Sequence, residues 1–184
     1  MRTIILVIAA ATMFLTTGCI GRAVSEGIGK VTGPKAVVVP VKPVSYNKHD
    51  LALVEYTRFE VEPFTDDFGG RTPSQVLTGL PAEVNHVLAQ KGIFSRSGGK
   101  TLVIRGKILS YEPATTVDQA FGPFEELVAR VYFVDKDSGQ VIGEYNCIGR
   151  SKETVNQGVP KKMQGLAEAI VNAILQHYPA PKEK

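Results

Sequence analysis

The chain is poor in cysteine, and its positive and negative charges nearly cancel. Its 184 residues include only two cysteines, Cys19 and Cys147, which excludes a Cys-x-x-Cys metal site and a disulfide-rich framework. Lys and Arg together number 21 and Asp and Glu 18, so the charge balance gives no reason to expect a nucleic-acid partner. The apolar run Ile4–Leu15 is shorter than the roughly 20 residues that a stable membrane-spanning helix needs.

The same N-terminal run has the layout of an export signal. Arg2 precedes the apolar run, and the small residues Thr16–Gly18 lead to Cys19. This order is similar to that of bacterial lipoprotein signals, in which cleavage occurs just before the cysteine. We therefore predict a signal peptide over residues 1–18 and lipidation of Cys19. The alternatives are an ordinary secretory signal with a chance cysteine, or an N-terminal anchor helix.

Lipidation of Cys19 would fix the location of the protein. A diacylglycerol on its sulfur and an acyl chain such as palmitate on its amine exceed the two anchors that stable membrane attachment needs. Residue 20 is Ile rather than the Asp that retains bacterial lipoproteins at the inner membrane, so the resemblance implies the outer membrane, with the periplasmic face as the default. Cys147 would then have no partner for an internal disulfide, and we expect it to be buried.

The remainder of the chain has room for one domain. Glycines and prolines are frequent from residue 19 to about residue 50, which predicts a lipidated cysteine followed by a flexible tether. Within it, Ala36–Val41 is β-prone and suits either a short edge strand or an extended arm. Residues 51–179 are long enough for a single domain with a hydrophobic core, and residues 180–184 form a polar tail.

Hydrophobic periodicity in residues 51–179 predicts strands and two amphipathic helices. Residues 53–63 alternate, with Tyr56 expected on the solvated face, and Thr72 and Pro73 are typical of a helix start. Pro81 should kink or split the first helix. The expected elements are strands at 53–63, 102–109, 127–135 and 141–149, and helices at 72–92 and 160–178. We predict an α+β fold, a two-layer sandwich of a mainly antiparallel sheet of four to five strands with two helices on one face.

Two segments carry a resemblance to known proteins. The run from Lys100 to Glu112 and the run from Val128 to Ile142 resemble an uncharacterised domain-of-unknown-function family of bacterial outer-membrane lipoproteins. The core is similar to that of the curli-secretion pore lipoprotein and to the N-terminal domain of the Tol-system periplasmic protein. The resemblance covers about residues 51–178 and rests on glycines and turns, so it implies a fold but no catalytic residue.

Acidic residues and histidines offer the strongest argument for an enzyme. Glu60, Glu62, Asp66 and Asp67 are close in sequence, and His86 follows on the predicted helix. Paired carboxylates are able to act as acid and base or to bind a cation. Glu60 and Glu62 lie on the predicted solvated face, however, and no histidine has a metal-binding partner at helical spacing. We therefore expect no catalytic site, no metal site and no cofactor.

Phe121 and Phe124 are the candidate partner-binding residues. They flank a Gly-Pro pair in a predicted loop, where two phenylalanines could anchor a partner or could fold back under the loop. The pair Lys161-Lys162 begins the last helix, and we interpret it as a solvated helix end.

These observations favour a non-catalytic outer-membrane lipoprotein that acts as a binding or assembly accessory of the cell envelope. The expected partners are the membrane, reached through the lipid on Cys19, and an envelope protein or further copies of the chain. A second hypothesis is a lipid- or small-ligand-binding auxiliary of an envelope transporter, with a cavity lined by Leu80, Val84, Ile170 and Ile174. A distant third is a hydrolytic enzyme, which requires the acidic residues and His86 to meet in one cleft.

Overall fold

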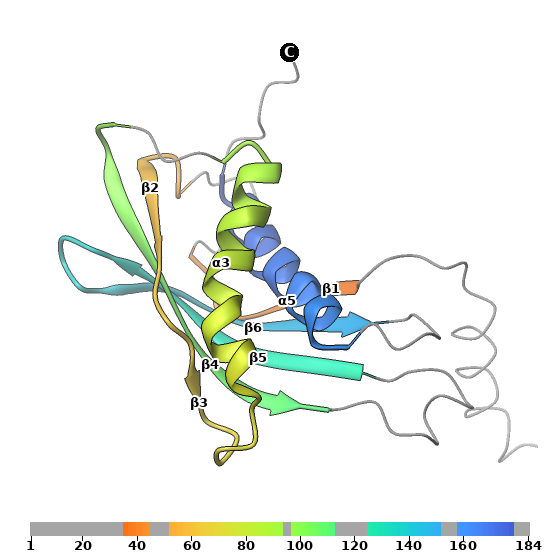
Figure 1. Cartoon of the computed structure of the whole chain (residues 1–184). Coiled ribbons are helices and arrows are strands. Elements are labelled where there is room, and N and C mark those ends of the chain that lie inside the picture. The colour runs from red at the N-terminus through yellow and green to blue at the C-terminus, as the bar shows by residue number, and fades with distance from the viewer. Residues whose placement is uncertain (1–34, 45–51, 94–96, 113–124, 152–157, 179–184) are drawn as a thin grey trace, which may run out of the picture.

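The computed structural model describes residues 35–44, 52–93, 97–112, 125–151 and 158–178. They form one sheet with two helices on one side of it (Figure 1). The strands are β1 (Lys35–Lys42), β2 (Tyr56–Val61), β3 (Thr65–Asp66), β4 (Lys100–Tyr111), β5 (Glu125–Asp135) and β6 (Val141–Ser151), and the helices are α3 (Ser74–Gln90) and α5 (Gly158–Leu175). The predicted α+β sandwich is confirmed.

The sheet has six strands in the order β1-β6-β5-β4-β2, with β3 also pairing with β4. Strands β2 and β3 run parallel to β4, and every other pairing is antiparallel. Strands β5 and β6 form a hairpin that turns at Gly139, whose φ of +69° favours glycine. The sheet exceeds the predicted four to five strands because β1, inside the predicted tether, pairs with β6 and the two-residue β3 pairs with β4.

The predictions for Tyr56 and Thr72 need correction. Tyr56 is only 5 % exposed, because a register shift between Tyr56 and Arg58 turns its side chain to the helix side of the sheet. Pro73, not Thr72, is the N-cap of α3, and the hydroxyl of Thr72 donates instead to Asp66 at 2.6 Å. Helix α3 also continues through Pro81 rather than splitting there.

The core lies between the helices and the sheet. Strands β4, β5 and β6 present alternate apolar side chains to it, and α5 presents the stripe that includes Leu166, Ile170 and Ile174. Gly149 of β6 permits this packing, because a Cβ there would lie 2.6 Å from the carbonyl oxygen of Lys162 and 2.8 Å from the carbonyl carbon of Gly165. No described helix has the length and apolarity needed to cross a membrane.

Several strands begin or finish at the same end of the sheet. Lys35 pairs with Arg150, Tyr111 with Leu127, and Glu125 with Ser151. The chain that comes from Cys19 therefore enters the sheet at the same end at which β4 finishes and β5 begins (Figure 1).

Candidate functional site

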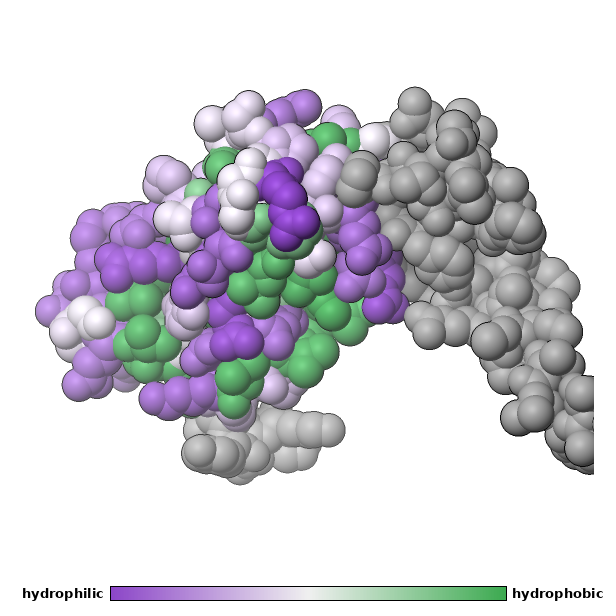
Figure 2. Space-filling view, turned by 90° about the horizontal axis from the view of Figure 1, so that it is seen from below, coloured by the Kyte–Doolittle hydropathy of each residue, from purple (hydrophilic) through white to green (hydrophobic). Residues whose placement is uncertain are grey.

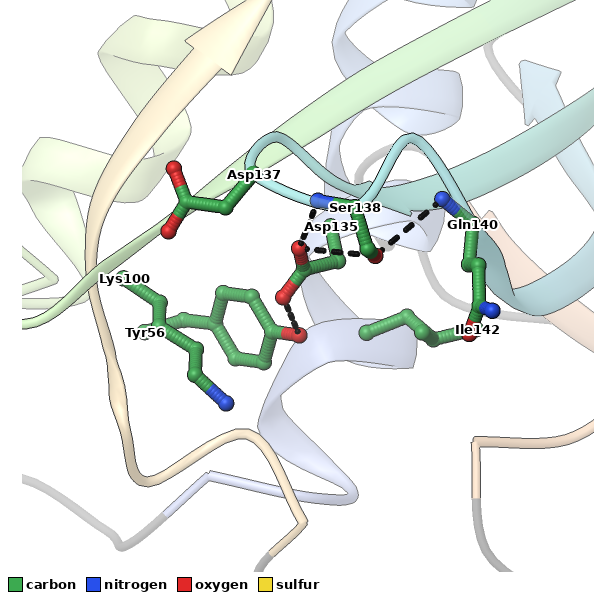
Figure 3. A pocket seen from close by; sticks show the side chains of 7 residues that line it. All are labelled: Tyr56, Lys100, Asp135, Asp137, Ser138, Gln140 and Ile142. Atoms are coloured by element: carbon green, nitrogen blue, oxygen red, sulfur yellow. Dashed lines mark hydrogen bonds between the residues drawn. The ribbon is translucent and has the colours of Figure 1, made fainter.

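An open pocket of about 560 Å³ lies beside the β5–β6 turn (Figure 3). The first residues of β2 and β4 form one wall, and the turn forms the other. It is lined by Tyr56, Lys100, Asp135, Asp137, Ser138, Gln140 and Ile142, of which all but Ile142 carry a polar side-chain group.

Asp135 organises the pocket. The hydroxyl of Tyr56 donates to its Oδ2 at 2.7 Å, and the backbone N–H and the hydroxyl of Ser138 donate to its Oδ1 at 2.8 and 2.9 Å. These donors, the backbone N–H of Ser138 first, lower the pKa of Asp135 to about 2. Burial, and then the hydrogen bond to Asp135, raise the pKa of Tyr56. Neither group exchanges its proton near neutral pH, so the pair is suited to fastening the hairpin to β2 rather than to acid–base chemistry.

Lys100 completes the wall of the pocket, but its charge is already paired. Its ammonium lies 2.9 Å from a carboxylate oxygen of Glu55 and 5.9 Å from the ring centre of Tyr56. The hydrogen bond to Glu55 is the main cause that raises the pKa of Lys100. The pocket therefore offers polar contacts without an unpaired charge at Lys100.

The acidic residues proposed for an enzyme do not meet in one cleft. Glu60 pairs with Lys136 at 2.5 Å, and Glu62 pairs with Arg105 at 2.6 Å. Asp66 accepts the hydroxyl of Thr72, which lowers its pKa, and Asp67 pairs with Lys107 at 3.3 Å. His86 lies on α3 beside Gln90, at 2.9 Å. Among the described residues, no three His, Cys, Asp or Glu side chains gather as metal ligands would.

The four residues predicted to line a ligand cavity belong to the core. Leu80 and Val84 of α3 and Ile170 and Ile174 of α5 are each 0 % exposed. All four are members of the hydrophobic cluster beneath the helices, and none lines the pocket beside the β5–β6 turn.

The three predicted site residues, Cys19, Phe121 and Phe124, lie outside the described residues. Cys147 is described: it is 0 % exposed, and desolvation raises the pKa of its thiol to about 12. The thiol is therefore protonated and inaccessible, as expected for a buried residue of the core.

The environment of Lys162 differs from the solvated helix end that the sequence predicts. It is 1 % exposed, and its ammonium donates to the carbonyl oxygen of Glu112 at 2.7 Å and lies 4.4 Å from the ring centre of Tyr111. It thereby joins the start of α5 to the end of β4. Helical spacing could have predicted the burial of this residue, because Lys162 lies one turn before the buried Leu166.

Ion pairs and hydrogen bonds cross the sheet face turned away from the helices. Arg130 donates to Glu144 and to Asn146, each at 2.6 Å, and Arg150 donates to Glu126 at 2.8 Å. These cross-strand pairs satisfy one another, so this face presents no block of one charge.

Exposed hydrophobic residues are concentrated on the edge strand β1. Of the four large hydrophobic side chains that are most exposed in the described residues, Val39 at 44 % and Val41 at 47 % belong to β1. The other two are Val54 at 51 % and Val141 at 41 %. The view from below shows hydrophobic residues at the surface as separate groups among hydrophilic ones (Figure 2).

Comparison with known proteins identifies a fold. No protein-family model matches the chain, and no curated protein matches it. The PelC dodecamer from Paraburkholderia phytofirmans is similar in structure, with a TM-score of 0.51 and 14 % identity over 79 % of this chain and 99 % of PelC. A single-residue variant of PelC is similar to the same degree, with a TM-score of 0.50 and 15 % identity over 78 % of this chain and 97 % of that one.

A minor lipoprotein from Acinetobacter baumannii matches more weakly, with a TM-score of 0.38 and 16 % identity over 65 % of this chain and 92 % of that one. At these identities the likeness to PelC shows a shared fold, and it covers almost the whole of PelC. The resemblance to a lipoprotein family of unknown function, and to the curli and Tol domains, stays a prediction.

Proposed function

We propose that this chain is a lipid-anchored protein of the outer membrane, held at the periplasmic face, that catalyses no reaction and acts by binding envelope components. The protein partner proposed for it is a second copy of the same chain. The observation that carries this proposal is the fold, which the chain shares with PelC, a protein that forms dodecamers. The cysteine that ends the predicted signal, Cys19, supplies the anchor.

Two features of the described residues agree with this proposal. The polar groups of the pocket beside the β5–β6 turn bond to one another and hold the fold, and the acidic residues of the enzyme hypothesis are each paired with different partners. The chain also enters the sheet at Lys35, no more than about 58 Å from Cys19 even when that stretch is fully extended. An anchored domain would thus stay close to the membrane surface.

Fractionation of cells that express Cys19→Ser tests the anchor. The unsubstituted protein should be found with the outer membrane and should incorporate labelled palmitate, whereas Cys19→Ser should do neither. Cys147→Ala is the matched control, because Cys147 is buried and should not affect the location. Membrane association of Cys19→Ser equal to that of the unsubstituted protein would contradict lipid anchoring.

Photo-crosslinking in cells tests the partner. A photoreactive residue at position 121 or 124 should form adducts with a defined envelope protein or with the chain itself, and the same residue at position 141, which is exposed on β6, is the control. Adducts with lipid alone would favour the lipid-binding auxiliary. Equal adducts from positions 121, 124 and 141 would remove Phe121 and Phe124 as binding residues.

A further inference from the structure

The two edges of the sheet differ in how they are protected. The edge formed by β2 and β3 is interrupted between Val61 and Thr65. Along and beside it lie ion pairs that include Glu62 with Arg105 and Asp67 with Lys107. Short strands and charges of this kind protect an edge against pairing with another chain. This edge is therefore poorly suited to self-association.

The β1 edge carries charged residues only at its two ends, Lys35 and Lys42. It is a longer strand, Lys35–Lys42, with β6 on one side and no described strand on the other. Its sequence is rich in valine, and Val39 and Val41 are nearly half exposed. Pro40 removes one backbone donor, so a partner would gain more from these side chains than from a continuous backbone ladder. An exposed, β-prone edge with apolar side chains is the type of surface that pairs with another chain.

We infer that β1 is the strand through which copies of this chain associate, with Val39 and Val41 packed against a neighbouring copy. This inference rests on the proposed function, since it names the contact surface of the self-association proposed there. Three observations favour a second copy over another partner. The fold is that of a protein that forms dodecamers, the other edge is protected by charges, and β1 is the first described element after the anchoring cysteine.

The position of β1 also favours contact between anchored copies. Copies held in one membrane by the same length of chain present β1 at similar heights, which raises the effective concentration of one β1 surface near another subunit.

The test compares five forms of the full lipidated protein, extracted in detergent: unsubstituted, Val39→Asp/Val41→Asp, Val39→Ile/Val41→Ile, Val54→Asp and Val141→Asp. Native mass spectrometry gives the number of copies, and circular dichroism confirms folding. The double substitution should raise the concentration needed for half-assembly by about tenfold or more, since a carboxylate at a contact loses its water. Val54 and Val141 are exposed to a similar extent and serve as matched controls, and Val39→Ile/Val41→Ile should assemble normally.

The outcomes separate this inference from the proposal on which it rests. If the unsubstituted protein and the double variant assemble equally, β1 is not the contact strand, while self-association stands. If the controls lose assembly as much as the double variant does, the role of β1 is likewise refuted. If the unsubstituted protein is monomeric at every concentration, the proposed self-association itself fails.

Discussion

The packing of α5 on β6 makes Gly149→Ala a demanding test of the fold. An added Cβ would lie 2.6 Å from the carbonyl oxygen of Lys162 and 2.8 Å from the carbonyl carbon of Gly165, and it would crowd the backbone N–H of Leu166. These are backbone atoms, so no side-chain rotation relieves the contact and the helix must move away from the sheet.

The expected cost of Gly149→Ala follows from that movement. Overpacking of a core costs about 1–3 kcal/mol, which outweighs the ~0.5–1 kcal/mol that alanine usually gains over glycine inside a strand. At roughly 4 °C per kcal/mol for a domain of this size, the melting temperature should fall by several degrees.

Thermal and urea unfolding followed by circular dichroism provide the assay for Gly149→Ala. Gly79→Ala in α3 is the matched control, because its Cβ would meet only the sulfur and methyl of Met163 at 3.4 and 3.5 Å. That flexible side chain is able to give way, so Gly79→Ala should be neutral or stabilising by up to ~1 kcal/mol. A Gly149→Ala variant as stable as the unsubstituted protein would refute the close approach of α5 to β6.

Two further predictions concern polar groups. Lys162→Met should lower the free energy of unfolding, because the carbonyl oxygen of Glu112 loses its ammonium donor. Lys161→Met is the control and should change the free energy of unfolding little. Equal effects of the two substitutions in urea unfolding would contradict the contact between α5 and β4. The lowered pKa of Asp135 predicts stability that is fully present above its usual value of 3.8 and is lost as the pH falls toward about 2. Tyr56→Phe removes one donor to that carboxylate, so the loss of stability between pH 4 and 2 should become smaller, and an unchanged acid profile would show that the bond does not contribute.

The layers of the fold were predictable because hydrophobic periodicity is strong in this chain. The apolar stripe of α5 and the alternation of apolar residues in β4 both mark the side of the element that packs on the core. Alternation predicts the wrong face for Tyr56 because one extra residue in β2 reverses the pattern. The sequence of a strand, read without that of its partner strand, does not reveal such a register shift.

The polar contacts were harder to predict than the layers. Asp135 and Tyr56 are 79 positions apart in sequence, and their hydrogen bond arises only when β2 lies beside β4 and the β5–β6 turn reaches back. Lys162 was interpreted as solvated from its charge alone, although its helical position places it over the core. The candidate binding residues Phe121 and Phe124 stay predictions of the sequence.

The mass of the complex extracted from the outer membrane tests lipid anchoring and self-association together. Cells expressing the full chain would be fractionated, and the purified protein would be analysed by native mass spectrometry in detergent. We expect a complex of several copies, each with the mass of a chain that begins at a triacylated Cys19. A single unlipidated copy, or a monomer in the soluble fraction, would contradict it.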